Sequence, residues 1–155
     1  MIDAMPSANV ANAERFERVG ITANAQTASQ TRDEFAAWLR QCFDLDPIRS
    51  SDLVLAINEA LANCAEFAYL ECLGTGTMDL LAWHDVVEST ITVLVSDRGS
   101  WRTPVEHNSR SRGRGIPLME ALSDRTSIQT SDRGTHVTLE WANVVRAGLR
   151  PRTNH

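Results

Sequence analysis

The stretch Thr77–Asp97, TMDLLAWHDVVESTITVLVSD, decides the fold of this 155-residue chain. Residues 77–83 and 88–96 are both rich in apolar and β-branched side chains, which is typical of strands. The turn between them, around His84 and Asp85, is short. Strands joined by a short turn pair antiparallel, so this stretch predicts a β-hairpin inside a sheet.

Further strands are expected on both sides of this hairpin. Residues 126–130 and 135–141 flank a turn formed by residues 132–134, which predicts a second hairpin. Residues 15–23, RFERVGITA, alternate apolar and polar side chains, as a strand exposed on one face does. Gly20 interrupts that alternation, so we expect an edge strand with a bulge near Gly20.

Two long helices are expected between the first strand and the hairpin. The first spans residues 27–43, with Ser29 or Thr31 as its cap, and Pro47 breaks it. The second spans residues 51–70 and begins at a capping Ser51. A third, short helix is expected over residues 113–122, after the long polar loop 97–112.

These elements predict an α+β fold, a two-layer α/β sandwich. Because short turns join the later strands, the sheet is expected to be mixed but mostly antiparallel, with the helices on one face, and not a doubly wound parallel sheet. The length suits one domain. We expect this domain to span residues 14–142, between a flexible N-terminal arm at 1–13 and a polar tail at 143–155.

The composition and charge of the chain disfavour several classes of function. The net charge of −5 disfavours general nucleic-acid binding. No stretch is long and apolar enough to span a membrane, and the N-terminus does not resemble a secretion signal. Three cysteines without a CxxC pair argue against a disulfide framework, so a cytoplasmic location is expected. All 15 basic residues are arginine, so phosphate recognition would need arginine, backbone amides or a metal.

The second helix carries the first candidate functional residues. At about 100° per residue, its apolar side is formed by one set of residues, Leu53, Ile57, Leu61, Cys64 and Ala68. Glu59, Asn63 and Glu66 fall nearly opposite, and Glu59 and Asn63 are neighbours four residues apart. This acid and amide are either a solvated helix face or part of a functional site.

Three glycine motifs follow. Asp97-Arg98-Gly99 ends a strand, Gly113-Arg114-Gly115 opens the short helix, and Gly134-Thr135 begins the last strand. Taken singly, each is an ordinary turn. Together they also suit a nucleotide pocket, because a carboxylate at a strand end can form a pocket floor and glycine amides at a helix start can bind phosphate.

In their order along the chain, EALAN (59–63), DRGSWRTP (97–104), GRGIPLM (113–119) and GT (134–135) resemble the GHKL ATPase superfamily. More narrowly, they are similar to the bacterial anti-sigma-factor serine/threonine kinases of sporulation and stress response. The resemblance implies the Bergerat ATP-binding fold, with ATP and Mg²⁺ as cofactors.

The resemblance also implies residue roles. Asn63 would bind Mg²⁺, and Glu59 would be the general base. Asp97 would accept the adenine amino group, Gly99 would leave room beside the base, and Thr135 would complete adenine recognition.

The phosphates would be bound by the amides of Gly113 and Gly115. Arg112 and Arg114 would offset phosphate charge, unless they are simply solvated loop residues. Phe67 departs from the family, which usually has a histidine there. Cys64 replaces a small apolar family residue and is interpreted as a core residue.

For function, the resemblance implies an anti-sigma factor that regulates transcription. It would phosphorylate a serine of a STAS-type anti-anti-sigma protein, hold a sigma factor inactive, and form a homodimer, with no direct contact to nucleic acid or membrane. Phe67 keeps a second hypothesis open: an ATP-binding adaptor that regulates protein partners without phosphotransfer. A third, a structural domain without nucleotide, fits poorly with the complete set of motif residues.

Overall fold

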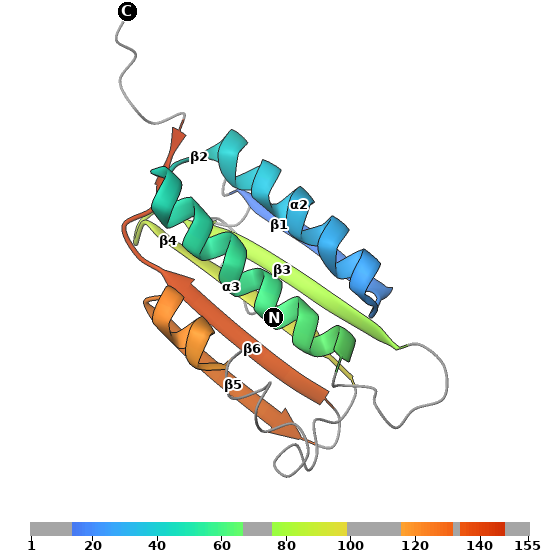
Figure 1. Cartoon of the computed structure of the whole chain (residues 1–155). Coiled ribbons are helices and arrows are strands. Elements are labelled where there is room, and N and C mark those ends of the chain that lie inside the picture. The colour runs from blue at the N-terminus through green and yellow to red at the C-terminus, as the bar shows by residue number, and fades with distance from the viewer. Residues whose placement is uncertain (1–13, 67–75, 99–115, 132–133, 148–155) are drawn as a thin grey trace, which may run out of the picture.

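The computed structural model describes residues 14–66, 76–98, 116–131 and 134–147. Five strands form one sheet in the order β1-β3-β4-β6-β5, and each strand is antiparallel to its neighbours. The strands are β1 (Arg15–Thr22), β3 (Thr77–Asp85), β4 (Thr90–Asp97), β6 (Gly134–Trp141) and β5 (Arg125–Ser131). Two long helices, α2 (Ala25–Cys42) and α3 (Pro47–Glu66), cover one face of this sheet (Figure 1). The predicted two-layer α+β sandwich is confirmed.

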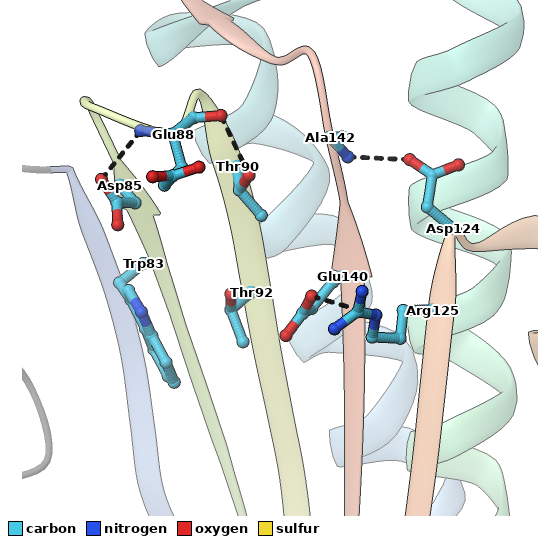
Figure 2. Close-up of a pocket in the computed structure, with 9 residues that line it drawn as sticks. All are labelled: Trp83, Asp85, Glu88, Thr90, Thr92, Asp124, Arg125, Glu140 and Ala142. Carbon is cyan, nitrogen blue, oxygen red and sulfur yellow. Dashed lines mark hydrogen bonds and ion pairs between the residues drawn. The ribbon is translucent and has the colours of Figure 1, made fainter.

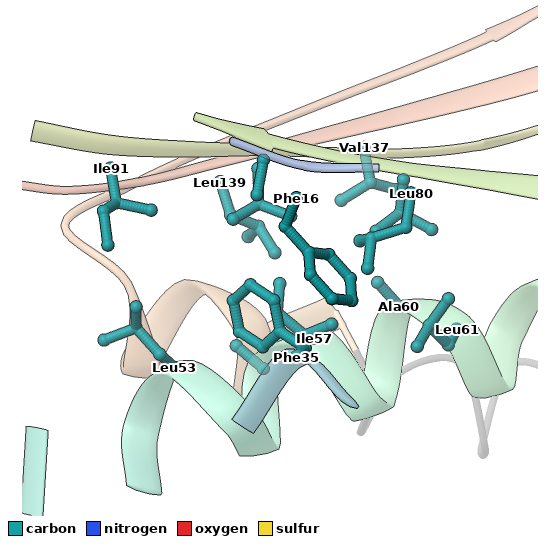
Figure 3. Close-up of a cluster of buried hydrophobic side chains, with 14 of the residues drawn as sticks. Phe16, Phe35, Leu53, Ile57, Ala60, Leu61, Leu80, Ile91, Val137 and Leu139 are labelled. Carbon is teal, nitrogen blue, oxygen red and sulfur yellow. The ribbon is translucent and has the colours of Figure 1, made fainter. Parts of the chain in front are cut away.

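The core lies between α3 and the sheet. Burial alternates along β3 and along β4 as far as Val95, because alternate side chains of a strand point to opposite faces, and Ser96 at the end of β4 is buried as well. Figure 3 shows sheet side chains such as Leu80 and Val137 directed toward Ile57 and Leu61 of α3. Leu53, Ile57 and Leu61 are each 0% exposed, which confirms the predicted apolar side of this helix as far as Cys64, whereas Ala68 and the predicted end of the helix at residue 70 lie outside the described residues.

The beginnings of both helices differ from the prediction. The Asn24 Oδ1 accepts a hydrogen bond from the Thr27 amide at 2.7 Å and caps α2. The Asp46 Oδ1 does the same for the Arg49 amide at 2.7 Å, at the start of α3. Pro47 therefore begins α3 and does not end the helix before it, because the first position of a helix needs no amide donor. Ser29, Thr31 and Ser51 lie inside helices and cap neither of them.

The strand predictions hold, with small shifts. The bulge in the edge strand β1 is present: its register with β3 shifts between Arg18 and Ile21, and Gly20 has a φ of 68°. The turn of the first hairpin is later than predicted, since β3 continues through His84 to Asp85. The helix of the GRGIPLM motif is described over residues 116–122.

A second, two-stranded sheet was not predicted. Strand β2 (Phe43–Asp44) pairs with β7 (Val145–Arg146). Strand β7 lies inside residues 143–155, the segment predicted as a polar tail. The His84 Nε2 lies 2.7 Å from the Val144 carbonyl oxygen, and the His84 ring packs 4.9 Å from the Phe43 ring. Strands of two residues have no periodicity, so sequence patterns do not reveal them.

No helix of the described residues is long and apolar enough to cross a membrane.

Candidate functional site

Asn63 is buried, which corrects its predicted place opposite the core. Its side chain is only 4% exposed, whereas Glu59 is half-buried and Glu66 is exposed. The buried side of α3 is wide because this helix packs against both the sheet and α2. Asn63 lies about 20° around the helix from Ala56, itself 0% exposed, so Asn63 is at the edge of the buried arc.

Asp97 and Thr135 lie side by side on neighbouring strands. They are directly paired in the register of β4 and β6. Asp97 is the last residue of β4 and is 2% exposed, and Thr135 is 1% exposed. The sheet thus brings together two residues that the sequence assigned to adenine recognition, although they are far apart along the chain.

Gly134 fits closely against the backbone of Asp97. It has a φ of 144°, and a Cβ atom at this position would lie 2.0 Å from the Asp97 carbonyl oxygen. Any other residue would displace the end of β4 or of β6. The glycine of the Gly134-Thr135 motif is therefore required by the strand pairing itself, a role that sequence analysis did not assign.

Cys64, the residue after Asn63, is buried on α3 and is only 1% exposed. Burial raises the pKa of the Cys64 thiol well above its usual value, and the charges of Asp97 and Asp79 raise it further. The thiol therefore stays protonated. Sequence analysis interpreted Cys64 as a core residue, and its burial agrees with this interpretation.

Two buried polar atoms at this site need a partner. The Asn63 Nδ2 and the Thr135 Oγ1 have no hydrogen-bond partner among the described residues. A buried polar atom without a partner costs about 1–3 kcal/mol, so such groups are usually satisfied by a ligand or by water. The Thr135 hydroxyl lies on the residue paired with Asp97, and the Asn63 amide lies on α3. Both unpartnered groups fit a polar ligand such as a nucleotide.

Five predicted site residues lie outside the described residues: Gly99, Arg112, Gly113, Arg114 and Gly115. Phe67 and the long loop that follows Arg98 do as well. Arg98 itself is described. Its Nη1 donates to the Thr77 Oγ1 at 3.1 Å, and its Nη2 lies 3.6 Å from the Asp79 Oδ2. The predicted phosphate-binding half of the site therefore stays a prediction.

A separate cavity of about 440 Å³ lies on the sheet face opposite α2 and α3 (Figure 2). It is lined by Trp83, by four carboxylate side chains and by one guanidinium, that of Arg125. Arg125 pairs with Glu140 at 3.9 Å, and Asp124 accepts the Ala142 amide at 2.7 Å. The predominantly acidic lining opposes a triphosphate, so this cavity is not the nucleotide site.

No group of three or more candidate metal ligands occurs among the described residues. The described site holds oxygen atoms that suit Mg²⁺ in the amide of Asn63 and in the carboxylates of Glu59 and Asp97.

Comparison with known proteins identifies the class. The family of histidine kinase-like ATPase domains matches residues 21–141, and the chain belongs to this family. The match includes all four motifs, and it confirms the resemblance to the GHKL ATPases. A domain of this family implies ATP binding.

The fold is also similar to that of a solved structure, the RsbU and RsbW domains of Rv1364c from Mycobacterium tuberculosis. The two chains share 22% sequence identity and superpose with a TM-score of 0.65. The match covers 92% of this chain and 34% of the other, so this chain spans about a third of that protein. At this identity the likeness concerns the fold.

Proposed function

We propose that this protein is an anti-sigma factor with serine/threonine kinase activity. It would bind Mg·ATP, phosphorylate a serine of a STAS-type anti-anti-sigma protein, and hold a sigma factor inactive. The observation that carries the ATP site is the pairing of buried Asp97 with buried Thr135, whose hydroxyl has no partner among the described residues. The motif resemblance and the likeness to a chain with an RsbW domain support the kinase branch.

Each described residue has a role in this proposal. The Asp97 carboxylate accepts a hydrogen bond from the adenine amino group, and the Thr135 hydroxyl completes the recognition of the base. The Asn63 amide oxygen binds Mg²⁺, which offsets phosphate charge when bound. Glu59, one turn before Asn63, faces partly toward solvent, where a partner's hydroxyl can approach.

The proposed reaction is a phosphoryl transfer. The oxygen of the acceptor serine forms a bond to the γ-phosphorus, and the bond from that phosphorus to the β–γ bridging oxygen breaks, which leaves ADP. Glu59 accepts the proton of the serine hydroxyl. Gly113, Gly115, Arg112 and Arg114 would neutralise and orient the phosphates, and Gly99 would leave room beside the base.

The remaining parts of the proposal concern assembly. The resemblance supports a homodimer that acts in the cytoplasm, without direct contact to nucleic acid or membrane. Phe67 favours one second candidate, an adaptor of the same fold that binds ATP and protein partners without phosphotransfer, because the kinases usually have a histidine at this position.

A calorimetric titration with ATP tests the site. We expect binding in the presence of Mg²⁺ and a large loss of affinity in EDTA. Labelled ATP and a STAS-type protein then test phosphotransfer, with Glu59→Gln as the variant and Glu66→Gln, an exposed acid on the same helix, as the control. Glu59→Gln is expected to bind ATP normally and to lose at least about 100-fold in transfer rate. Normal transfer by Glu59→Gln contradicts the base assignment, and binding without transfer by the unmodified protein favours the adaptor.

A further inference from the structure

The Arg98 side chain lies on the face of the sheet opposite α2 and α3. Its Nη1 donates to the Thr77 Oγ1 at 3.1 Å, and its Nη2 lies 3.6 Å from the Asp79 Oδ2. Along β3, these two partners alternate with Met78 and Leu80, which are 0% exposed and belong to the core. Because alternate side chains of a strand point to opposite faces, Thr77 and Asp79 face away from the helices, and so does the guanidinium that contacts them.

Asp79 connects this guanidinium to the bulge of β1. The Asp79 Oδ1 accepts the Gly20 amide hydrogen at 2.6 Å, whereas the Oδ2 faces Arg98. The Asp79 side chain is 17% exposed, and the Arg98 side chain is 64% exposed. An ion pair is weakened when both partners must give up side-chain freedom. The bond to Gly20 already restrains Asp79, so its carboxylate is a prepared anchor for Arg98.

Arg98 follows Asp97 directly, at the point where β6 approaches the end of β4 most closely. A Cβ atom at Gly134 would lie 2.0 Å from the Asp97 carbonyl oxygen and 2.9 Å from the Arg98 Cα. The end of β4 is thus in contact with the backbone of β6 on one side, and the Arg98 side chain ties it to β3 on the other. Both contacts restrain the main chain beside the proposed adenine acceptor.

We infer that Arg98 is a positioning residue: its bonds to Thr77 and Asp79 hold the end of β4 so that the Asp97 carboxylate meets the 6-amino group of the purine. This inference rests on the function proposed above. The same geometry directs the Arg98 guanidinium away from α3, which carries the proposed magnesium ligand, so Arg98 does not serve the phosphates.

The test compares three variants and two nucleotides. Arg98→Ala removes the anchor, and Asp79→Asn removes its charged partner but keeps an oxygen for the Gly20 amide. Arg125→Ala is the matched control, because Arg125 is also an exposed arginine with a carboxylate partner, Glu140 at 3.9 Å. Calorimetry with Mg²⁺ gives dissociation constants for ATP and for inosine triphosphate, whose base has a carbonyl oxygen in place of the amino group. Thermal unfolding without nucleotide shows whether each variant is folded.

We expect the unmodified protein to bind ATP more tightly than inosine triphosphate. In Arg98→Ala and in Asp79→Asn this preference should fall roughly two- to five-fold through weaker ATP binding alone, the range for an ion pair with a solvent-exposed partner. The double variant should lose no more than either single variant, because both remove the same contact. Arg125→Ala should keep the preference of the unmodified protein. An equal loss for both nucleotides in Arg98→Ala would assign Arg98 to the phosphates, and an unchanged preference would leave it without a role in the site. Either result overturns the inference.

Amide hydrogen exchange without nucleotide separates this inference from the proposed function. Exchange at the end of β4 and at Thr135, the residue paired with Asp97, should be faster in Arg98→Ala than in the unmodified protein and unchanged in Arg125→Ala. Unchanged exchange in Arg98→Ala shows that this side chain does not hold the strand end, and this overturns the inference. If exchange is faster but the unmodified protein does not bind ATP, the proposed function fails, and the role of Arg98 in the preference for adenine fails with it.

Discussion

Gly134 is the residue with the least tolerance for substitution in the described site. Gly134→Ala places a Cβ atom 2.0 Å from the Asp97 carbonyl oxygen, at a φ of 144° that side chains rarely adopt. We expect a loss of at least about 2 kcal/mol of unfolding free energy and a large loss of ATP affinity, because Asp97 must move. Urea denaturation and calorimetry measure both.

Gly20 provides the matched control for this substitution. It also has a positive φ, 68°, but a Cβ atom there meets nothing within 4 Å, and Gly20 lies in the edge strand β1. Gly20→Ala should cost only about 1 kcal/mol, from backbone strain alone, and should leave ATP affinity unchanged. Equal effects of the two substitutions on ATP affinity would show that the contact of Gly134 with Asp97 is unimportant.

Asn63 allows a prediction in which function and stability diverge. Asn63→Ala removes the proposed magnesium ligand, so we expect at least about ten-fold weaker Mg·ATP binding and no remaining difference between Mg²⁺ and EDTA. It also removes a buried Nδ2 that has no partner among the described residues. Unfolding free energy without nucleotide should therefore change by less than about 1 kcal/mol. A binding curve that still depends on Mg²⁺ would contradict the assignment.

The residue scale also shows where sequence patterns were insufficient. The resemblance assigned both Asp97 and Thr135 to adenine recognition, but neither the pairing of their strands nor the burial of Asn63 was predicted. A helical wheel separates two sides, whereas α3 has two neighbours, the sheet and α2, and its buried arc extends to Asn63.

At the scale of elements, the start of α3 matters most because this helix carries Glu59 and Asn63. Asp46→Ala removes the carboxylate that accepts the Arg49 amide at 2.7 Å. We expect a loss of about 1 kcal/mol in urea denaturation, the usual effect of removing a helix cap. Ser51→Ala, at the cap predicted from sequence, is the control and should change stability by less than about 0.5 kcal/mol. A larger loss of stability in Ser51→Ala than in Asp46→Ala would instead identify Ser51 as the cap.

The elements themselves were largely predictable from sequence. The alternation in β3 and β4 and the apolar stripe of α3 are strong periodic signals, and both correspond to observed elements. Helix starts were less accurate, since several residues near each start can cap and only the tertiary structure selects Asn24 and Asp46. Strands β2 and β7 exist only as a pair, which a local pattern cannot show.

At the scale of the whole molecule, His84 connects the sheet to the chain that follows β6. The Val144 carbonyl oxygen accepts its Nε2–H at 2.7 Å, and its Nδ1 has no partner among the described residues. The ring is 2% exposed and contacts Phe43 of β2. Burial is the largest effect on the pKa of His84 and lowers it, and the charge of Arg146 lowers it further. The hydrogen bond to Val144 and the charges of Asp85 and Glu14 raise the pKa, but the net shift is downward.

This lowered pKa predicts how stability depends on pH. Neutral His84 contributes fully to the free energy of unfolding above a pH of about 6.5, the pKa of histidine in an unfolded chain. This contribution is lost as the pH falls from there toward the lower pKa of His84 in the folded protein, because the unfolded chain then binds a proton that the folded protein does not. Urea denaturation between pH 7 and pH 5.5 measures this loss. His84→Gln should flatten the dependence in that window, whereas His136→Gln, at an exposed position, should preserve it. If the unfolding free energy of His84→Gln depends on pH as steeply as that of the unmodified protein, another group causes the dependence.

The pairing of Asp97 with Thr135 has a consequence for protein synthesis. Strand β4 leaves the ribosome well before β6, and β5 is made between them. Until β6 is available, β4 remains an open edge whose backbone groups are unpaired on one side and whose residues Ile91, Val93 and Val95 have high strand propensity. A nascent or truncated chain that lacks β6 is therefore prone to aggregate, and we expect that ATP cannot rescue it, because the strand that covers the open edge of β4 also carries Thr135 of the proposed adenine site.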